Sequence, residues 1–281
     1  MFKHFQTSAI LLLLGILPCN LAAQNLGDFQ YDESKLYAET KQVNQFFRRF
    51  NGEEYKTGER LYEKDKDFRS RKLRKKYVNL LYNLDNNILT DAAKEKFNAL
   101  ILDKDDPVYL EFHGGEWFCE LLTVFTYEGQ EHELTLFLKL QEEMVGSKWV
   151  INGIYFEAFY DLLKKPDNSN FNNKKFLHPL SHELGFMNIF RVFNESDSLE
   201  YFADKDFQPD YLSLFFFELK KGRLEFKTVK NLKFHFFQVE GWYFELTYFN
   251  REGYNTGWLI SNLIEIDATN REILLNYIYH E

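Results

Sequence analysis

Two short segments of the chain carry a tryptophan that is followed three residues later by a glutamate. Trp117 and Glu120 form the first pair, and Trp242 and Glu245 form the second. A glutamate in an apolar pocket could anchor a ligand, and burial there would raise its pKa. In a strand, however, an offset of three places each tryptophan and its glutamate on opposite faces. A core tryptophan beside a glutamate in a structural hydrogen bond is therefore the competing interpretation.

Two asparagines occupy matching positions in another pair of similar segments, residues 150–155 and 274–279. A buried amide needs hydrogen-bond partners, which either a ligand or a neighbouring strand could supply. These asparagines and the two Trp–Glu pairs make up the predicted ligand-binding residues, which are Trp117, Glu120, Asn152, Trp242, Glu245 and Asn276.

Histidines give one weak route to catalysis. If a cavity enclosed them, His113 or His235 could act as a general base together with Glu120 or Glu245. These histidines are scattered along the chain without a matching pattern of aspartates. The sequence therefore predicts no catalytic residue, and an enzyme remains the less favoured class.

Metal and cofactor motifs are also weak. His178 and His182 have the spacing of zinc ligands on one helix face, but Pro179 instead favours the start of a helix at that point. There is no His-Glu-x-x-His motif, no Gly-x-Ser-x-Gly elbow, no Walker loop and no Gly-x-Gly-x-x-Gly turn before a helix. We therefore predict neither a metal nor another cofactor.

Composition places the chain among globular proteins. Its 281 residues include 30 Phe, 17 Tyr and 4 Trp, so 18% of the chain is aromatic and can form a large buried core. The formal net charge of −9 argues against a nucleic-acid partner, because phosphate contacts need a basic surface.

The N-terminus has the pattern of a secretory signal peptide covering residues 1–23. Lys3 supplies the positive start, an apolar stretch follows, and Ala23 ends a small-residue cleavage site. We expect an exported protein, periplasmic or extracellular, with no transmembrane segment in the mature chain. Lipid attachment at Cys19 is the alternative, although Pro18 is a poor residue to precede a lipidated cysteine.

Internal similarity predicts a duplicated unit. Three segments recur in the same order, and a polar, asparagine-rich stretch at 164–176 separates the copies like a linker. The expected first domain covers 34–163 and the second covers 177–281. The matching segments are 43–51 with 186–194, 116–121 with 241–246, and 150–155 with 274–279.

Each copy is expected to run from helices to strands, which makes the chain α+β. Helices are predicted near 43–50, 67–84, 90–101 and 211–219, and from Pro179 onward. Strands are predicted after Pro107, with a turn at Glu128 and Gly129, and over 223–238, 241–250, 257–266 and 272–280. Alternation along the strand that contains Trp117 places Cys119 and Leu121 on one face and Phe118 on the other. Both faces of these strands are mainly apolar, so we expect the sheets of the two copies to cover one another, unless a partner protein does so.

This order of elements resembles the NTF2-like fold, in which helices precede a strongly curved antiparallel sheet. The doubled form resembles tandem NTF2-like domains of secreted bacterial proteins. The resemblance covers most of residues 35–281, and it implies a cone whose interior often holds a small ligand. It also implies that some relatives are enzymes that use Asp, His or Tyr inside the cone, but a fold alone does not transfer function.

The resulting expectation is an exported, non-enzymatic envelope protein that binds a small apolar ligand or a protein partner. The first alternative is an NTF2-like hydrolase or isomerase acting on a small hydrophobic substrate. The second is a purely structural interaction module, because bulky phenylalanine rings could fill both cones. An apolar pocket with a few polar anchors would favour binding, and a buried His or carboxylate with an orienting partner would favour catalysis.

Overall fold

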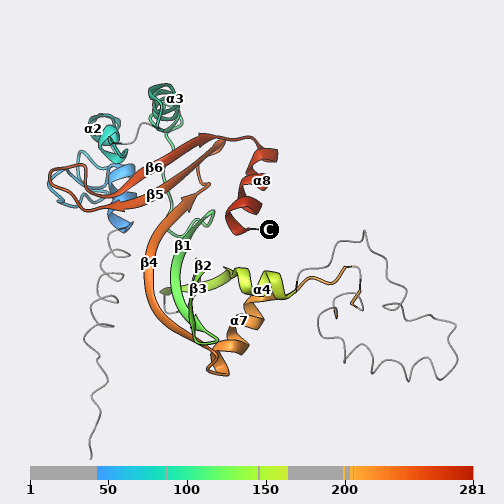
Figure 1. Cartoon of the computed structure of the whole chain (residues 1–281). Coiled ribbons are helices and arrows are strands. Elements are labelled where there is room, and N and C mark those ends of the chain that lie inside the picture. The colour runs from blue at the N-terminus through green and yellow to red at the C-terminus, as the bar shows by residue number, and fades with distance from the viewer. Residues whose placement is uncertain are drawn as a thin grey trace, which may run out of the picture.

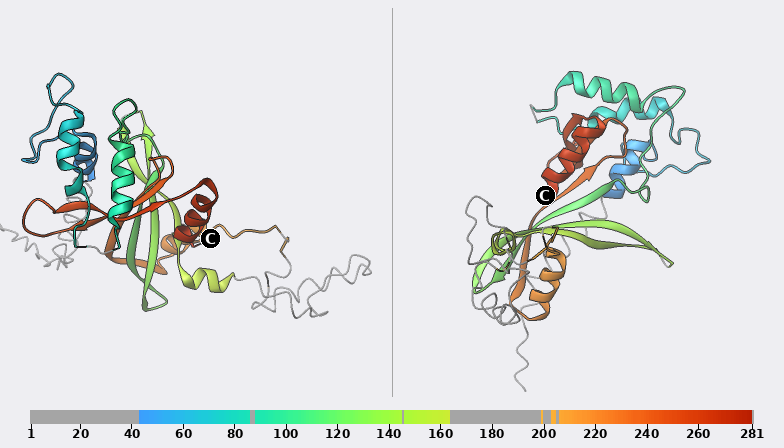
Figure 2. Two further views of the ribbon diagram at one scale, coloured as in Figure 1. Left: turned by 90° about the horizontal axis from the view of Figure 1, so that it is seen from above. Right: turned by 90° about the vertical axis from the view of Figure 1, so that its right-hand side faces the viewer.

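The computed structural model describes residues 43–85, 88–144, 146–163, 199, 203–204 and 206–280. Within these residues, six antiparallel strands form one open sheet in the order β3-β2-β1-β4-β5-β6. Figure 1 shows its strong curvature, and Figure 2 shows how far β5 and β6 are turned relative to the first three strands. The strands are β1 (Trp117–Tyr127), β2 (Gln130–Glu143), β3 (Gly146–Tyr155), β4 (Leu224–Phe236), β5 (Trp242–Phe249) and β6 (Gly257–Glu265).

Helices pack at both ends of this sheet, so the α+β class is confirmed. The helix at residues 43–51, α2 (Arg71–Tyr77) and α3 (Asp91–Ile101) gather beside β5 and β6. At the opposite end lie α4 (Glu157–Leu162) and α7 (Tyr211–Lys220), and α8 (Ala268–Tyr279) ends near α4. The expected helix over 67–84 is shorter than predicted, because α2 passes into a 3-10 turn, η1 (Val78–Leu81).

Side-chain caps and turn residues explain where several elements begin. Thr90 accepts a hydrogen bond from the Ala93 backbone N–H at the start of α3, and Asp210 does the same for Ser213 at the start of α7. The turn predicted at Glu128 and Gly129 joins β1 to β2, and both residues have positive φ, at 52° and 79°. Two consecutive positive φ values match the twist of a tight hairpin.

The predicted face-to-face packing of two separate sheets is wrong. β1 from the expected first domain pairs with β4 from the second, from Trp117 opposite Phe236 to Tyr127 opposite Leu224. The two sets of three strands therefore join edge to edge through backbone hydrogen bonds and form one sheet. The domain boundaries remain a prediction, and residues 164–176 and 186–194 lie outside the described residues.

The C-terminal strand predicted at 272–280 is also wrong, because this segment belongs to α8. Asp267 caps the helix by accepting from the Asn270 backbone N–H, and His280 ends it with a left-handed φ of 59°. Asn276 is therefore a helical residue, whereas its predicted counterpart Asn152 lies on β3. The second matched pair is not equivalent either, since Trp117 lies on β1 and Trp242 on β5.

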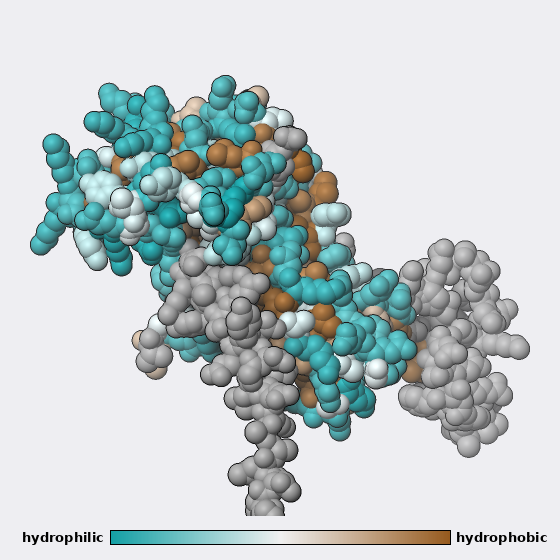
Figure 3. Space-filling view, turned by 60° about the vertical axis from the view of Figure 1, so that its left-hand side comes forward, coloured by the Kyte–Doolittle hydropathy of each residue, from teal (hydrophilic) through white to brown (hydrophobic). Residues whose placement is uncertain are grey.

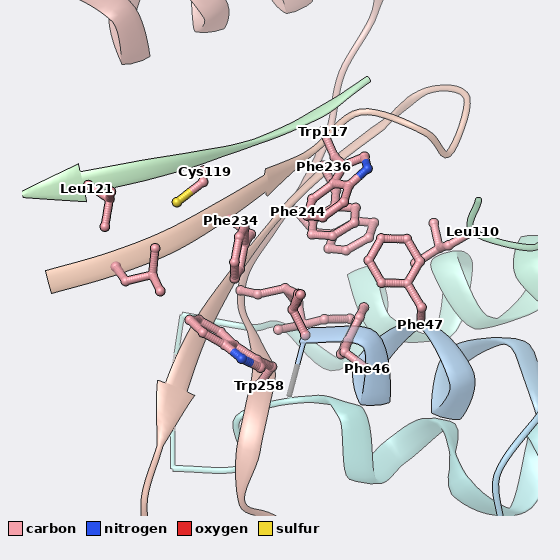
Figure 4. Close-up of a cluster of buried hydrophobic side chains, with 14 of the residues drawn as sticks. Phe46, Phe47, Leu110, Trp117, Cys119, Leu121, Phe234, Phe236, Phe244 and Trp258 are labelled. Atoms are coloured by element: carbon pink, nitrogen blue, oxygen red, sulfur yellow. The ribbon is translucent and has the colours of Figure 1, made fainter. Parts of the chain in front are cut away.

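The main core lies against one face of the sheet. Trp117, Phe236 and Phe244 form a continuous stack, with ring centroids 5.3 and 4.8 Å apart and interplanar angles of 13° and 5° (Figure 4). Phe46 and Phe47 of the first described helix pack against this stack. Since Cys119 and Leu121 share this cluster and Phe118 does not, the predicted alternation of faces along β1 is confirmed.

A smaller apolar cluster covers part of the opposite face. Phe118, Phe137, Phe237 and Tyr243 of the sheet region pack with Ile278 of α8. The second face is thus covered in part by a helix, where the sequence had predicted another sheet. On the outside, the end of the molecule that contains α2 and α3 carries mainly hydrophilic side chains (Figure 3). None of the helices in the described part of the chain is long and apolar enough to cross a bilayer.

Cys119 is expected to resist alkylation in the folded protein. Its side chain is buried, and burial raises the pKa of the thiol well above its ordinary value, which suppresses the reactive thiolate. In a Cys19→Ser chain, iodoacetamide should label Cys119 at least roughly 100-fold more slowly under native conditions than in denaturant, as measured by mass spectrometry. Equal rates in both states would contradict the buried placement.

Candidate functional site

The six predicted ligand-binding residues fall in three different places. Trp117 and Trp242 belong to the main core, and the Trp117 indole N–H donates to the Phe112 carbonyl at 3.0 Å. Glu120 and Glu245 lie on the opposite face, in the polar cluster described next. The asparagines Asn152 and Asn276 line a groove beside β3 and α8. The predicted separation of each tryptophan from its glutamate is therefore confirmed.

A polar cluster is centred on the buried ring of His235, which is 1% exposed. Its Nε2 lies 2.8 Å from Oε2 of Glu120, and its Nδ1 lies 2.8 Å from the hydroxyl of Tyr243. β1, β4 and β5 bring these side chains together as neighbouring strands. The ring of Phe118 stacks on His235 at 4.8 Å, so one side of the imidazole is closed by an apolar group.

The second glutamate joins the cluster through a lysine. Lys233 Nζ lies 3.4 Å from Oε1 of Glu120 and 3.7 Å from Oε2 of Glu245. Glu245 also accepts from the Ser261 hydroxyl at 3.0 Å. Four strands thus contribute side chains to a cluster that contains two carboxylates and one ammonium group.

Two pKa shifts follow from this arrangement. Desolvation is the largest single influence on Glu120 and opposes its ionisation, but hydrogen bonds and charges from His235 and Lys233 outweigh it and lower the pKa of Glu120. Burial raises the pKa of Tyr243, with the nearby glutamates adding to the effect, so its hydroxyl stays protonated. The Tyr243 hydroxyl and the Glu120 carboxylate thus give each ring nitrogen of His235 a hydrogen-bond partner.

A carboxylate, an imidazole and a hydroxyl joined by hydrogen bonds are groups that can take part in general acid–base chemistry. The contact between His235 and Glu120 is one of the pairs that the sequence analysis named. His113 is instead exposed before β1, and it contacts the Ser147 hydroxyl at 3.0 Å. Tyr243 and Lys233 were not predicted, because the pairing of β1 with β4 brings Lys233 to Glu120 and the pairing of β4 with β5 brings Tyr243 to His235.

A groove of about 480 Å³ lies between β3, the start of α7 and α8. Its apolar walls include Ile154, Leu212 and Leu275, and its aromatic walls are tyrosines. Tyr160 of α4 and Tyr211 of α7 stack with centroids 4.1 Å apart and planes at 16°. His235 does not line this groove.

Amide groups provide polar atoms in the groove. Asn152 Nδ2 donates to the Tyr279 hydroxyl at 3.3 Å, whereas Asn152 Oδ1 is buried without a hydrogen-bond partner among the described residues. A buried acceptor without a donor is unusual in folded proteins and points to a missing partner. Asn276 reaches the same groove from α8.

A second hollow of about 410 Å³ adjoins the groove, with which it shares Tyr160, Pro209 and Tyr211. Its further lining includes Asp161 and Phe207. Within the described ranges, no three His, Cys, Asp or Glu side chains gather in a way that could hold a metal ion. Comparison of the chain with family models, curated proteins and solved structures found no match.

Proposed function

We propose that this chain is an exported, non-enzymatic binding protein, and that the groove beside β3 and α8 takes a small, largely apolar ligand. The observation that carries the proposal is a groove with apolar and tyrosine walls and two asparagine amides. Its volume of about 480 Å³ falls within the range of roughly 300–1,000 Å³ for small-molecule sites. Such sites combine apolar walls with a few polar anchors.

The amide of Asn152 is the best-supported anchor. Its Nδ2 is engaged by Tyr279, and its Oδ1 has no partner among the described residues. A ligand with an N–H or O–H group could supply the missing donor after a small rotation of the side chain. Because an unsatisfied buried acceptor costs about 1–3 kcal/mol, a ligand that satisfies it would gain affinity.

Indole is a suitable first probe, because it is flat, apolar and carries one N–H donor. Its binding is expected to shift backbone amide NMR signals of residues that line the groove, including Gly153 and Leu275. Asn276→Trp should fill the groove and weaken binding at least roughly tenfold. Ile273→Trp on the same helix is the matched control, since Ile273 is 62% exposed and does not line the groove. Equal binding of indole to both variants would contradict the proposal.

The alternative activity, an NTF2-like hydrolase or isomerase, draws support from the 2.8 Å contact between His235 and Glu120. A reaction at this pair needs a substrate path to a histidine that is 1% exposed. A substrate whose turnover is abolished by His235→Gln, while indole binding persists, would favour this alternative. A purely structural module is the third possibility, and it would leave the groove without a ligand.

The same proposal includes an origin for the architecture, in which the chain consists of tandem NTF2-like domains. Its support is the order of strands, since each half contributes three consecutive antiparallel strands and the halves meet at β1 and β4. The signal peptide at residues 1–23 and the exported location are likewise proposals that come from the sequence pattern alone.

A further inference from the structure

We propose that the ligand of the groove is an organic cation, such as a small quaternary ammonium compound. This inference rests on the proposed function and narrows it from apolar ligands in general to ligands with a positive charge. Three observations support it, namely the tyrosine walls, the sign of the charged groups that line both cavities, and the unpartnered amide oxygen.

The tyrosine walls are held in place before any ligand arrives. Tyr160 and Tyr211 stack on each other at 4.1 Å, and Tyr160 also contacts Tyr155 at 5.0 Å. Tyr279 packs on Phe137 at 4.5 Å and accepts a hydrogen bond from Asn152. Within the described residues, the ring of Tyr211 has Tyr160 as its stacking partner, and the electron-rich face of a tyrosine ring attracts cations such as ammonium compounds.

Among the described residues that line the two cavities, both charged groups are acidic. Asp210 lines the groove and Asp161 lines the adjoining hollow. Among the described residues that line either cavity there is no lysine, arginine or histidine. Hydrogen bonds from the Ser213 hydroxyl and backbone N–H lower the pKa of Asp210, so this carboxyl is ionised at neutral pH.

Asn152 adds a third group of the same polarity. Its buried Oδ1 presents a partial negative charge without a donor among the described residues. A cation in the groove would be attracted by the Asp210 carboxylate and, at longer range, by this oxygen, whereas an anionic ligand would be repelled by both. The lining therefore discriminates by charge as well as by shape.

Three probes of one shape separate charge from apolar contact. Choline is positive, 3,3-dimethylbutan-1-ol is its uncharged counterpart, and 3,3-dimethylbutanoate is negative. Titrations followed by backbone amide NMR are expected to show choline binding at least roughly fivefold more tightly than the alcohol, with the carboxylate weakest.

Two substitutions test the source of this preference. Asp210→Asn keeps a good helix cap but removes the charge, and it should reduce the preference for choline. Asp267→Asn is the matched control, because Asp267 caps α8 in the same way and does not line the groove. Tyr211→Leu keeps an apolar side chain but removes the ring, and it should weaken choline binding more than binding of the alcohol.

The outcomes distinguish this inference from the proposed function. If indole binds in the groove but choline and the alcohol bind equally, the cation inference is wrong and the binding function stands. If neither indole nor any of the three probes shifts a groove signal, the proposed function itself fails. A choline preference that survives Asp210→Asn and Tyr211→Leu unchanged would also overturn the assignment to these walls.

Discussion

Phe244→Ala should lower the free energy of unfolding by about 3–5 kcal/mol, the usual cost of emptying a buried aromatic site. Phe244 is fully buried and stacks on Phe236 at 4.8 Å. It also contacts Phe50 of the first described helix and Phe97 of α3, at 6.4 and 5.8 Å. The substitution thus removes contacts between the sheet and both helices. Because the surrounding core is closely packed, the neighbouring side chains cannot easily move in to fill the space.

Equilibrium unfolding in urea would measure this loss. Phe216→Ala is the matched control, because Phe216 is 42% exposed on α7 and its removal should cost less than about 1 kcal/mol. If Phe244→Ala does not fold, Phe244→Leu keeps part of the volume and should cost about 1–2 kcal/mol. A cost at Phe244 no larger than that at Phe216 would contradict the described core.

The second large effect is expected at Glu120. Glu120→Gln should lower the free energy of unfolding at neutral pH by about 1.5–3 kcal/mol, the range for a hydrogen bond to a charged group. The glutamine keeps the shape of the side chain, but it removes the negative charge from the contacts with His235 and Lys233. In the variant, Lys233 keeps its contact with the Glu245 carboxylate but loses the negative charge of Glu120.

This loss should depend on pH in a defined direction. The pKa of Glu120 in the folded protein is below its ordinary value of 4.5, so folding favours the ionised form. The stabilisation is therefore present above that ordinary value and disappears as the pH falls through the lower pKa of the folded state. Unfolding free energies of Glu120→Gln and the parent protein should converge in acid.

Glu225→Gln serves as the control for the pH series, because Glu225 is exposed on β4. Its curve should run parallel to that of the parent protein at every pH. A difference between Glu120→Gln and the parent protein that stays constant into acid would show that the charge of Glu120 does not stabilise the fold.

Local patterns predicted the elements better than their arrangement. Alternation along β1 placed Cys119 and Phe118 on opposite faces, and turn chemistry located the hairpin at Gly129. The pairing of β1 with β4 has no local signal, because it joins residues about 100 to 120 positions apart, from Tyr127 with Leu224 to Trp117 with Phe236. Apolar residues at 274–278 fit a strand as well as a helix, and the cap at Asp267 was the overlooked cue.

Parts of the candidate site followed from the sequence for different reasons. His235 and Glu120 were named as a pair on chemical grounds, and strand pairing brings them together. Asn152 and Asn276 do share a groove, but as residues of a strand and a helix, where the sequence had predicted equivalent strand positions. Tyr160 and Tyr211 were missed, because a groove wall built from two separate helices has no signature in either segment.

The central pairing of β1 with β4 has a consequence for biosynthesis. Tyr127 leaves the ribosome long before its partner Leu224, and at ordinary elongation rates a gap of about 100 residues lasts about 5–20 s. Throughout that interval the nascent β1–β2 hairpin has an unpaired edge that other chains could join. Chaperones that hold the emerging polypeptide would thus matter more for the yield of this protein than for one whose neighbouring strands are made consecutively.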